Sequence, residues 1–154
     1  MASYRTILCP TDLSPAGDAA VALAYRLVED GGTVHLLHVS EPGFIVLPFD
    51  IAPVMVAHAT PAAMAEHERK VAEHLKTLVP APARGVTTKT HVVGDVGPSA
   101  LIQKAAKEAG ADVIVMGTHG RSGFGKLMLG SVASDVLHHA TVPVILVKAP
   151  KPKK

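Results

Sequence analysis

The stretch that decides the fold runs from residue 117 to residue 131 and reads Gly117-Thr118-His119-Gly120-Arg121-Ser122-Gly123-Phe124-Gly125-Lys126-Leu127-Met128-Leu129-Gly130-Ser131. The apolar run Val113-Ile114-Val115-Met116 precedes it, and a helical pattern over residues 132–140 follows. This order predicts a buried strand, a glycine-rich loop and a helix. In an open parallel sheet an anionic ligand binds at such a place, because backbone N–H groups at the start of the helix point toward it. Glycine suits the loop, since it has no β-carbon to block the approach.

Two well-known phosphate motifs almost fit this stretch. Residues 120–126 have the spacing of a P-loop, but Leu127 stands where that motif requires the Ser or Thr that holds Mg²⁺. The dinucleotide motif G-x-G-x-x-G fails as well, because Met128 stands at its third glycine. A spacing that does hold is G-x2-G-x9-G-S, formed by Gly117, Gly120, Gly130 and Ser131. The alternative is a long glycine loop with no ligand.

On this spacing, with a strand before it and a helix after it, the sequence resembles the universal stress protein family. In the ATP-binding branch of that family, the same spacing marks the loop that holds the phosphates and the ribose. The resemblance covers nearly the whole chain, from residue 4 to the last expected strand. It implies that the protein binds ATP.

Strands and helices alternate along the rest of the chain. Apolar runs predict strands at residues 6–9, 33–39, 86–93, 113–116 and 144–147. Helices are expected to open at Ser14-Pro15, Thr60-Pro61, Gly97-Pro98 and Ser131, and the first of them to end at Gly31-Gly32. The alternation predicts a single α/β domain over residues 1–149, an open parallel five-stranded sheet with helices on both faces, followed by a basic tail at residues 150–154.

The pattern alone does not give the order of the strands. The resemblance implies the order 3-2-1-4-5, the Rossmann-like arrangement of the adenine nucleotide alpha hydrolase-like fold. This order places the first and fourth strands side by side, so that their carboxyl ends flank a crevice. The resemblance further implies that the nucleotide site includes Pro10, Thr11 and Asp12, and that Val39 and Met116 lie against the adenine. Asp12 could hold the ribose or a water on Mg²⁺, or it could form only an Asx turn before the helix.

The start of the fourth helix, Gly130-Ser131-Val132, is the expected phosphate contact, because its unpaired N–H groups carry the positive end of the helix dipole. Ser131 could cap the helix, bind phosphate or do both. In the loop, Arg121 and Lys126 either neutralise phosphate oxygens or are simply solvated. His119 either lines the crevice with Gly120 or stabilises the loop.

The other histidines form no metal motif in the sequence. His35 and His38 lie three apart on an expected strand and so point to opposite faces. His67 and His74 are too far apart on one helix for a single ion. Cys9 is the only cysteine, which excludes an internal disulfide and fits a buried core position, although a redox role stays open.

Composition limits the function further. The net charge is +2 and the content of aromatic residues is 3%, which argues against a stacking platform for single-stranded nucleic acid. No signal-peptide pattern and no apolar run of about 20 residues is present, so we expect a cytoplasmic protein without membrane or nucleic-acid partners. Residues 41–59 form a long apolar segment that could be a flap, a cover for the sheet edge or a partner surface.

Together these features predict a cytoplasmic stress-response protein that holds ATP, with or without Mg²⁺, as a regulatory ligand. Little turnover is expected, because no Glu or His is clearly placed to activate an attacking water. A slow ATPase or nucleotidyl-transferring enzyme, and an interaction module with a vestigial site, are the alternatives. The resemblance also implies a homodimer, paired through the exposed apolar edge of the last strand.

Overall fold

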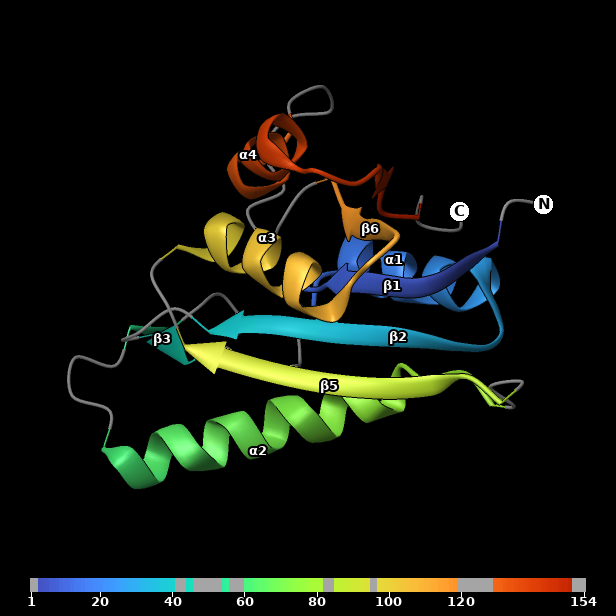
Figure 1. The fold of residues 1–154 in the computed structure, drawn as a ribbon. Helices are drawn as coiled ribbons and strands as arrows, with labels where there is room; N and C mark the ends of the chain where they lie inside the picture. The colour runs from blue at the N-terminus through green and yellow to red at the C-terminus, as the bar shows by residue number, and fades with distance from the viewer. Residues whose placement is uncertain are drawn as a thin grey trace.

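Figure 1 shows the chain as a computed structural model, which describes residues 3–40, 44–45, 54–55, 60–81, 85–94, 97–118 and 129–150. The strands in these ranges are β1 (Tyr4–Pro10), β2 (Val28–Ser40), β3 (Phe44–Ile45), β4 (Val54–Met55), β5 (Thr87–Gly94), β6 (Val113–Gly117) and β7 (Val144–Val147). The helices are α1 (Pro15–Leu27), α2 (Pro61–Thr77), α3 (Pro98–Ala109) and α4 (Ser131–His139).

Five of the strands form one parallel sheet in the order β5-β2-β1-β6-β7. Counted along the chain, this is the order 3-2-1-4-5, so the predicted fold class and topology are confirmed. β1 lies at the centre between β2 and β6, while β5 and β7 form the open edges.

The core has two halves, one on each face of the sheet. Ile7 and Leu36 pack with α1 and α2 on one face, whereas their neighbours Leu8 and Leu37 pack with α3 and α4 on the other. This alternation is what strands buried on both faces require, and Figure 1 shows α2 below β2 and β5 and α3 above these two strands. The adjacent strands β1 and β6 thus lead to helices on opposite faces, α1 and α4, and their carboxyl ends mark the topological switch point of the sheet.

The predicted helix starts are confirmed. Thr60 caps α2, since its Oγ1 accepts a hydrogen bond from the amide of Ala63 at 3.2 Å, and a proline occupies the first turn of α1, α2 and α3. Gly110 ends α3 in the left-handed conformation, with φ 61°. Within the described ranges, none of these helices combines the length and apolar character that crossing a bilayer would need.

The predicted end of the first helix at Gly31-Gly32 is wrong. α1 ends at Leu27, and the next residue, Val28, is already extended and begins β2. Tyr4 pairs with Val28 whereas Thr6 pairs with Thr33, so β2 uses more residues than β1 over this stretch. The two glycines absorb this bulge, because Gly31 takes φ 78° and a β-carbon on Gly32 would lie 2.7 Å from a backbone oxygen of β1.

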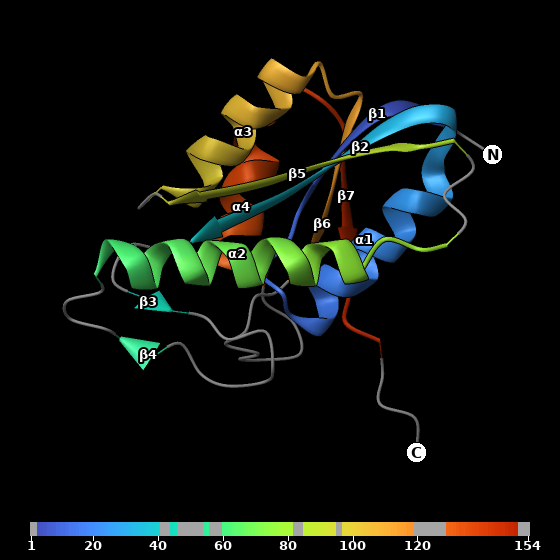
Figure 2. The same ribbon diagram turned by 90° about the horizontal axis from the view of Figure 1, so that it is seen from below.

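The apolar segment at residues 41–59 contains a short pairing that the sequence did not predict. β3 and β4 form an antiparallel pair, with Phe44 opposite Met55 and Ile45 opposite Val54. Figures 1 and 2 place the pair at the end of the molecule to which β2 and β5 point. The rest of this segment lies outside the described residues, so the role of residues 41–59 as flap, cover or partner surface stays a prediction. The basic tail from residue 151 also lies outside them.

Cys9 is a core residue. It is fully buried among the side chains that pack with α1 and α2. Burial raises the pKa of its thiol, because the thiolate would lose its hydration. The predicted core position is confirmed, and the thiol is not in a reactive setting.

Candidate functional site

The turn between β1 and α1 carries three short polar side chains that bind its own backbone. Thr11 Oγ1 accepts a hydrogen bond from the amide of Leu13 at 3.1 Å, and Asp12 Oδ1 accepts one from the amide of Ser14 at 3.1 Å. Ser14 Oγ caps α1 by accepting from the amide of Gly17 at 3.2 Å. Leu13 has a φ of 63°, a costly conformation for a branched side chain that the surrounding bonds hold in place. The Asx turn, which was the alternative to a ligand role for Asp12, is therefore present.

Two bonds tie this turn to β2. The amide of Thr11 donates to the carbonyl oxygen of Leu37 at 2.9 Å. The carbonyl oxygen of Thr11 lies 2.9 Å from Nδ1 of the buried His38, which must donate because a carbonyl oxygen only accepts. Pro10 and Thr11 are buried, while Asp12 is partly exposed. Of these three predicted site residues, Asp12 is thus the one whose side chain reaches the surface.

The end of β6 packs against the first turn of α1. A β-carbon built on Gly117 would lie 3.0 Å from Cβ of Ala16 and 3.2 Å from the amide nitrogen of Gly17. Gly17 is itself tight, because a β-carbon there would lie 3.0 Å from Asp12 Oδ1. The two glycines therefore let the Asp12 turn and the end of β6 come together, as the strand order predicted.

The glycine-rich stretch is closed at its base. The amide of Thr118 donates to the carbonyl oxygen of Val147 at 2.8 Å, which continues the β6–β7 pairing. The carbonyl oxygen of Thr118 accepts in turn from the amide of Gly130 at 2.9 Å. The chain therefore leaves β6 after Thr118 and returns beside it at Gly130, at the start of α4.

The amino end of α4 has no side-chain cap. Gly130 is the N-cap residue, with φ −62° and ψ 152° and no side-chain hydrogen bond to the helix. Ser131 is therefore the first helical residue and not the cap, and its side chain is exposed, while Val132 is half-buried. The first N–H groups of a helix have no partner within the helix, so this end can offer backbone donors and a positive dipole to an anion.

The two residues expected beside adenine lie on the α3 and α4 face. Val39 is half-buried and packs against the core on that face. Met116 belongs to the same core and is only 5% exposed, so a ligand would reach its backbone more readily than its side chain. His119, Gly120, Arg121 and Lys126 lie outside the described residues, and their roles stay predictions.

A partly buried carboxylate lies near Asp12. Burial raises the pKa of Asp18, the charge of His74 on α2 lowers it, and the charge of Asp12 raises it again. Oδ1 of Asp18 is buried and accepts no hydrogen bond from the described part of the chain. The Asp12 turn therefore already has negative charge beside it, which favours a cation or a hydrogen-bond donor near these carboxylates.

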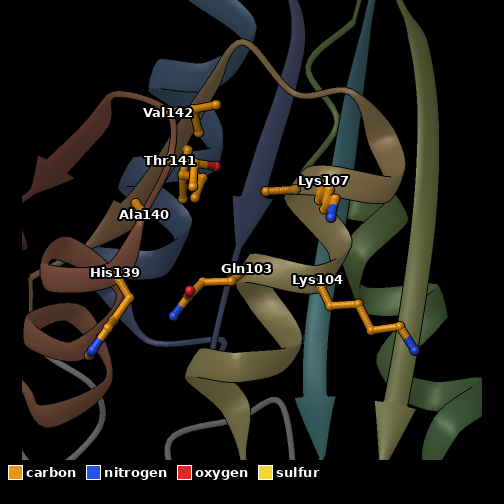
Figure 3. A pocket seen from close by; sticks show the side chains of 9 residues that line it. Gln103, Lys104, Lys107, His139, Ala140, Thr141 and Val142 are labelled. Carbon is orange, nitrogen blue, oxygen red and sulfur yellow. The ribbon is translucent and has the colours of Figure 1, made fainter.

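A cavity of about 300 Å³ lies elsewhere, between α3, α4 and the start of β7. Figure 3 shows Gln103 pointing from α3 toward α4, while Lys104 extends away from it. Because Ile114, near the start of β6, and Val142, just before β7, line it, the cavity lies toward the amino ends of these strands. It is thus at the opposite end of the sheet from the Asp12 turn and Gly130, and it is not part of the predicted site.

Sequence reasoning missed three residues that shape the site. They are Gly17, Thr118 and His38. A glycine in the first turn of a helix is a poor helix former, and that was the available signal for Gly17. Thr118 stood in the decisive stretch, but its role is carried by its backbone, and His38 needed the β1–β2 register to be recognised.

The sequence profile of the universal stress protein family matches residues 3–148. The chain is 34% identical over 148 residues to universal stress protein G of Escherichia coli O157:H7, covering 94% of this chain and 99% of that protein. Among solved structures, protein MJ0577 superposes with a TM-score of 0.77 at 25% identity, covering 98% of this chain and all of that chain. A universal stress protein from Archaeoglobus fulgidus in complex with dAMP superposes with a TM-score of 0.59 at 22% identity, covering 96% and 100% of the two chains.

These matches define a class first: a single-domain, open, parallel α/β sheet with its switch point between β1 and β6. Within that class the chain belongs to the universal stress protein family.

Proposed function

We propose that this protein binds an adenine nucleotide, ATP, at the carboxyl ends of β1 and β6. The observation that carries the proposal is the bond from Gly130 to Thr118, which sets the uncapped start of α4 beside the end of β6. The end of β6 in turn packs on α1 at Gly17, next to Asp12. At the carboxyl ends of β1 and β6, the start of α4 therefore offers backbone N–H donors and the turn after β1 offers the carboxylate of Asp12. This combination suits a polyphosphate joined to a ribose.

The proposed roles follow from this placement. The backbone of Gly130, Ser131 and Val132 receives the phosphates, and the exposed hydroxyl of Ser131 can add a donor. Asp12 holds the ribose or a water on Mg²⁺. Pro10 and Thr11 are buried and form the floor of the proposed site. The bonds of Thr11 to β2 fix the position of the neighbouring Asp12.

The remaining contacts complete the proposed site. Val39 and the backbone of Met116 lie on the face where adenine would pack, and aliphatic contact of this kind predicts modest selectivity for the base. Gly117, His119, Gly120 and Arg121 belong to the glycine-rich stretch that the family resemblance assigns to the phosphates and the ribose. The family relative solved with dAMP supports an adenine nucleotide as the ligand class.

In this proposal ATP is a regulatory ligand with little turnover, in a cytoplasmic stress-response protein that forms a homodimer through β7. The family supports the stress-response role. β7 lies at an open edge of the sheet, and all of its residues are only half-buried. An apolar strand at an open edge favours pairing with a second copy.

Mass spectrometry of the molecules released when the purified protein is denatured tests the ligand. We expect ATP or ADP in near-stoichiometric amount from the wild-type protein and much less from the Gly130→Val variant. A titration with a fluorescent ATP analogue then gives the affinity of the emptied protein. Release of nothing, together with no binding in the titration, would refute the proposal.

A further inference from the structure

His35 of β2 and His91 of the edge strand β5 lie against each other, although 56 residues separate them. Nδ1 of His35 and Nε2 of His91 are 3.1 Å apart, and the two ring planes differ by only 5°, with centroids 5.3 Å apart. In the strand register His91 is opposite Leu37, two residues along from His35. Both rings therefore project from the same face of the sheet, the face covered by α3 and α4.

One ring of the pair is fixed and the other is open to solvent. His35 is 8% exposed, so packing limits the orientation of its ring. His91 is exposed on the edge strand. A hydrated ion can thus reach the two facing nitrogens from the edge of the sheet.

We propose that the His35–His91 pair binds a divalent transition-metal ion of the Zn²⁺ or Ni²⁺ type, bridging β2 and β5. Imidazole nitrogen is a preferred ligand of these ions. Two Zn–N bonds of about 2.0–2.1 Å at a tetrahedral angle place their nitrogens about 3.3 Å apart, close to the observed 3.1 Å. The ring that donates in the metal-free pair moves its proton to its other nitrogen, so that both facing nitrogens present lone pairs.

The site is built for modest affinity. Among the described residues no group of three or more His, Cys, Asp or Glu side chains is gathered to hold a metal. Water therefore completes the coordination, and binding is weaker than at a structural zinc site with four protein ligands.

Lys89 provides a test that distinguishes a bound cation from a bound anion. It is the register partner of His35. Burial, then the charge of His91, then that of Lys89 lower the pKa of His35, which favours the uncharged imidazole that binds metal. The ammonium of Lys89 nevertheless repels a cation directly. Removing it should tighten the binding of a metal ion, whereas it would weaken the binding of an anion between the same three side chains.

The experiment is a calorimetric titration of the full chain with Zn²⁺ at pH 7.5, without nucleotide. His91→Gln should weaken the binding at this pair at least tenfold, and Lys89→Gln should tighten it two-fold or more. His139→Gln, which removes an exposed histidine on α4, is the matched control and should change nothing.

A second readout follows the bridge itself. Zn²⁺ should raise the melting temperature of the wild-type protein and of His139→Gln, but not of His91→Gln, because an ion held by His35 and His91 adds a link between β2 and β5 to their backbone pairing. Equal Zn²⁺ affinity in wild type and His91→Gln, weaker binding in Lys89→Gln, or no Zn²⁺ binding by the wild type would each overturn the proposal.

Discussion

The amide of Gly130 donates a hydrogen bond to the carbonyl oxygen of Thr118 at 2.9 Å, so the start of α4 lies beside the end of β6. The amide of Thr118 donates in turn to the carbonyl oxygen of Val147, which extends the β6–β7 pairing. The start of α4 is therefore fixed to the end of β6 through the backbone, and Gly130 contributes no side-chain cap. The first N–H groups of a helix have no partner within the helix. In the proposed function these groups of α4 bind the phosphates, which leads to the first prediction.

Gly130→Val should weaken nucleotide binding while the fold survives. The backbone of Gly130 (φ −62°, ψ 152°) is one that valine adopts readily, so the helix start is kept. The added side chain crowds the N–H groups that would meet the phosphates. We expect the affinity for a fluorescent ATP analogue to fall at least tenfold, about 1.4 kcal/mol, with Gly130→Ala in between. An unchanged affinity in a folded valine variant would place the phosphates elsewhere.

Gly17→Ala should destabilise the protein, although alanine is the better helix former by about 1 kcal/mol. The new β-carbon would overlap Thr11 and lie 3.0 Å from Asp12 Oδ1, so the turn must move. We expect a net loss of about 1–2 kcal/mol in the free energy of unfolding, measured by urea denaturation, and weaker nucleotide binding. Gly94→Ala is the control, because its nearest neighbour is 3.8 Å away. Equal stability of the two variants would argue against a tight turn.

Most of the fold could be predicted from the sequence, because the signals for its helices and strands are local. The Ser14-Pro15 and Thr60-Pro61 pairs marked helix starts through capping and through the fixed φ of proline, and both proved correct. Gly31-Gly32 misled because glycine fits a helix end and a bulge equally well. Only the register of β2 against β1 distinguishes the two.

The sequence predicts where the candidate site lies, but it could not predict how that part of the structure is built. The carboxyl ends of β1 and β6 follow from the strand order, which the family resemblance supplied. The bonds of His38 to Thr11 and of Gly130 to Thr118 join residues whose meeting depends on register and on loop closure. The contact of His35 with His91 is equally non-local, so spacing along the chain could not have revealed it.

Asp18→Asn should stabilise the protein at neutral pH, and the advantage should shrink in acid. Burial is the main cause that raises the pKa of Asp18. The folded-state pKa of Asp18 lies above the unfolded value near 4, so the folded state binds the proton more tightly. The contribution of Asp18 to stability therefore declines as the pH rises from the unfolded pKa to the folded one. The asparagine variant has no such dependence. Urea midpoints at pH 4 and pH 7 measure this, with the exposed Asp30→Asn as control. A gap between Asp18→Asn and wild type that narrows with rising pH would contradict the prediction.

Leu146→Pro should give a folded monomer. Ile114 donates to the carbonyl of Pro143, and Thr118 donates to that of Val147, so alternate residues of β7 face β6 and the amide of Leu146 faces the open edge. Proline there removes a donor that a second copy would use, whereas Ile145→Pro breaks the pairing with β6 and lowers the melting temperature. Light scattering at micromolar concentration gives the mass. A wild-type monomer, or a dimer that survives Leu146→Pro, would rule out pairing through this edge.

Turnover of bound ATP should be far below the roughly 1–100 s⁻¹ of dedicated phosphoryl-transfer enzymes. Fast transfer needs an aligned water, a clamped metal and a group that orients the attacker. Asp135, the nearest acid after the loop, is engaged elsewhere, since it accepts a hydrogen bond from Ser99 and lies 3.2 Å from Nδ1 of His139. Asp12 already accepts from the amide of Ser14, so it is better placed to steady a ligand than to activate water. Phosphate release under saturating ATP and Mg²⁺ measures this, with Gly130→Val showing how much activity comes from contaminants. A rate of about one per second, lost in that variant, would make the protein an ATPase.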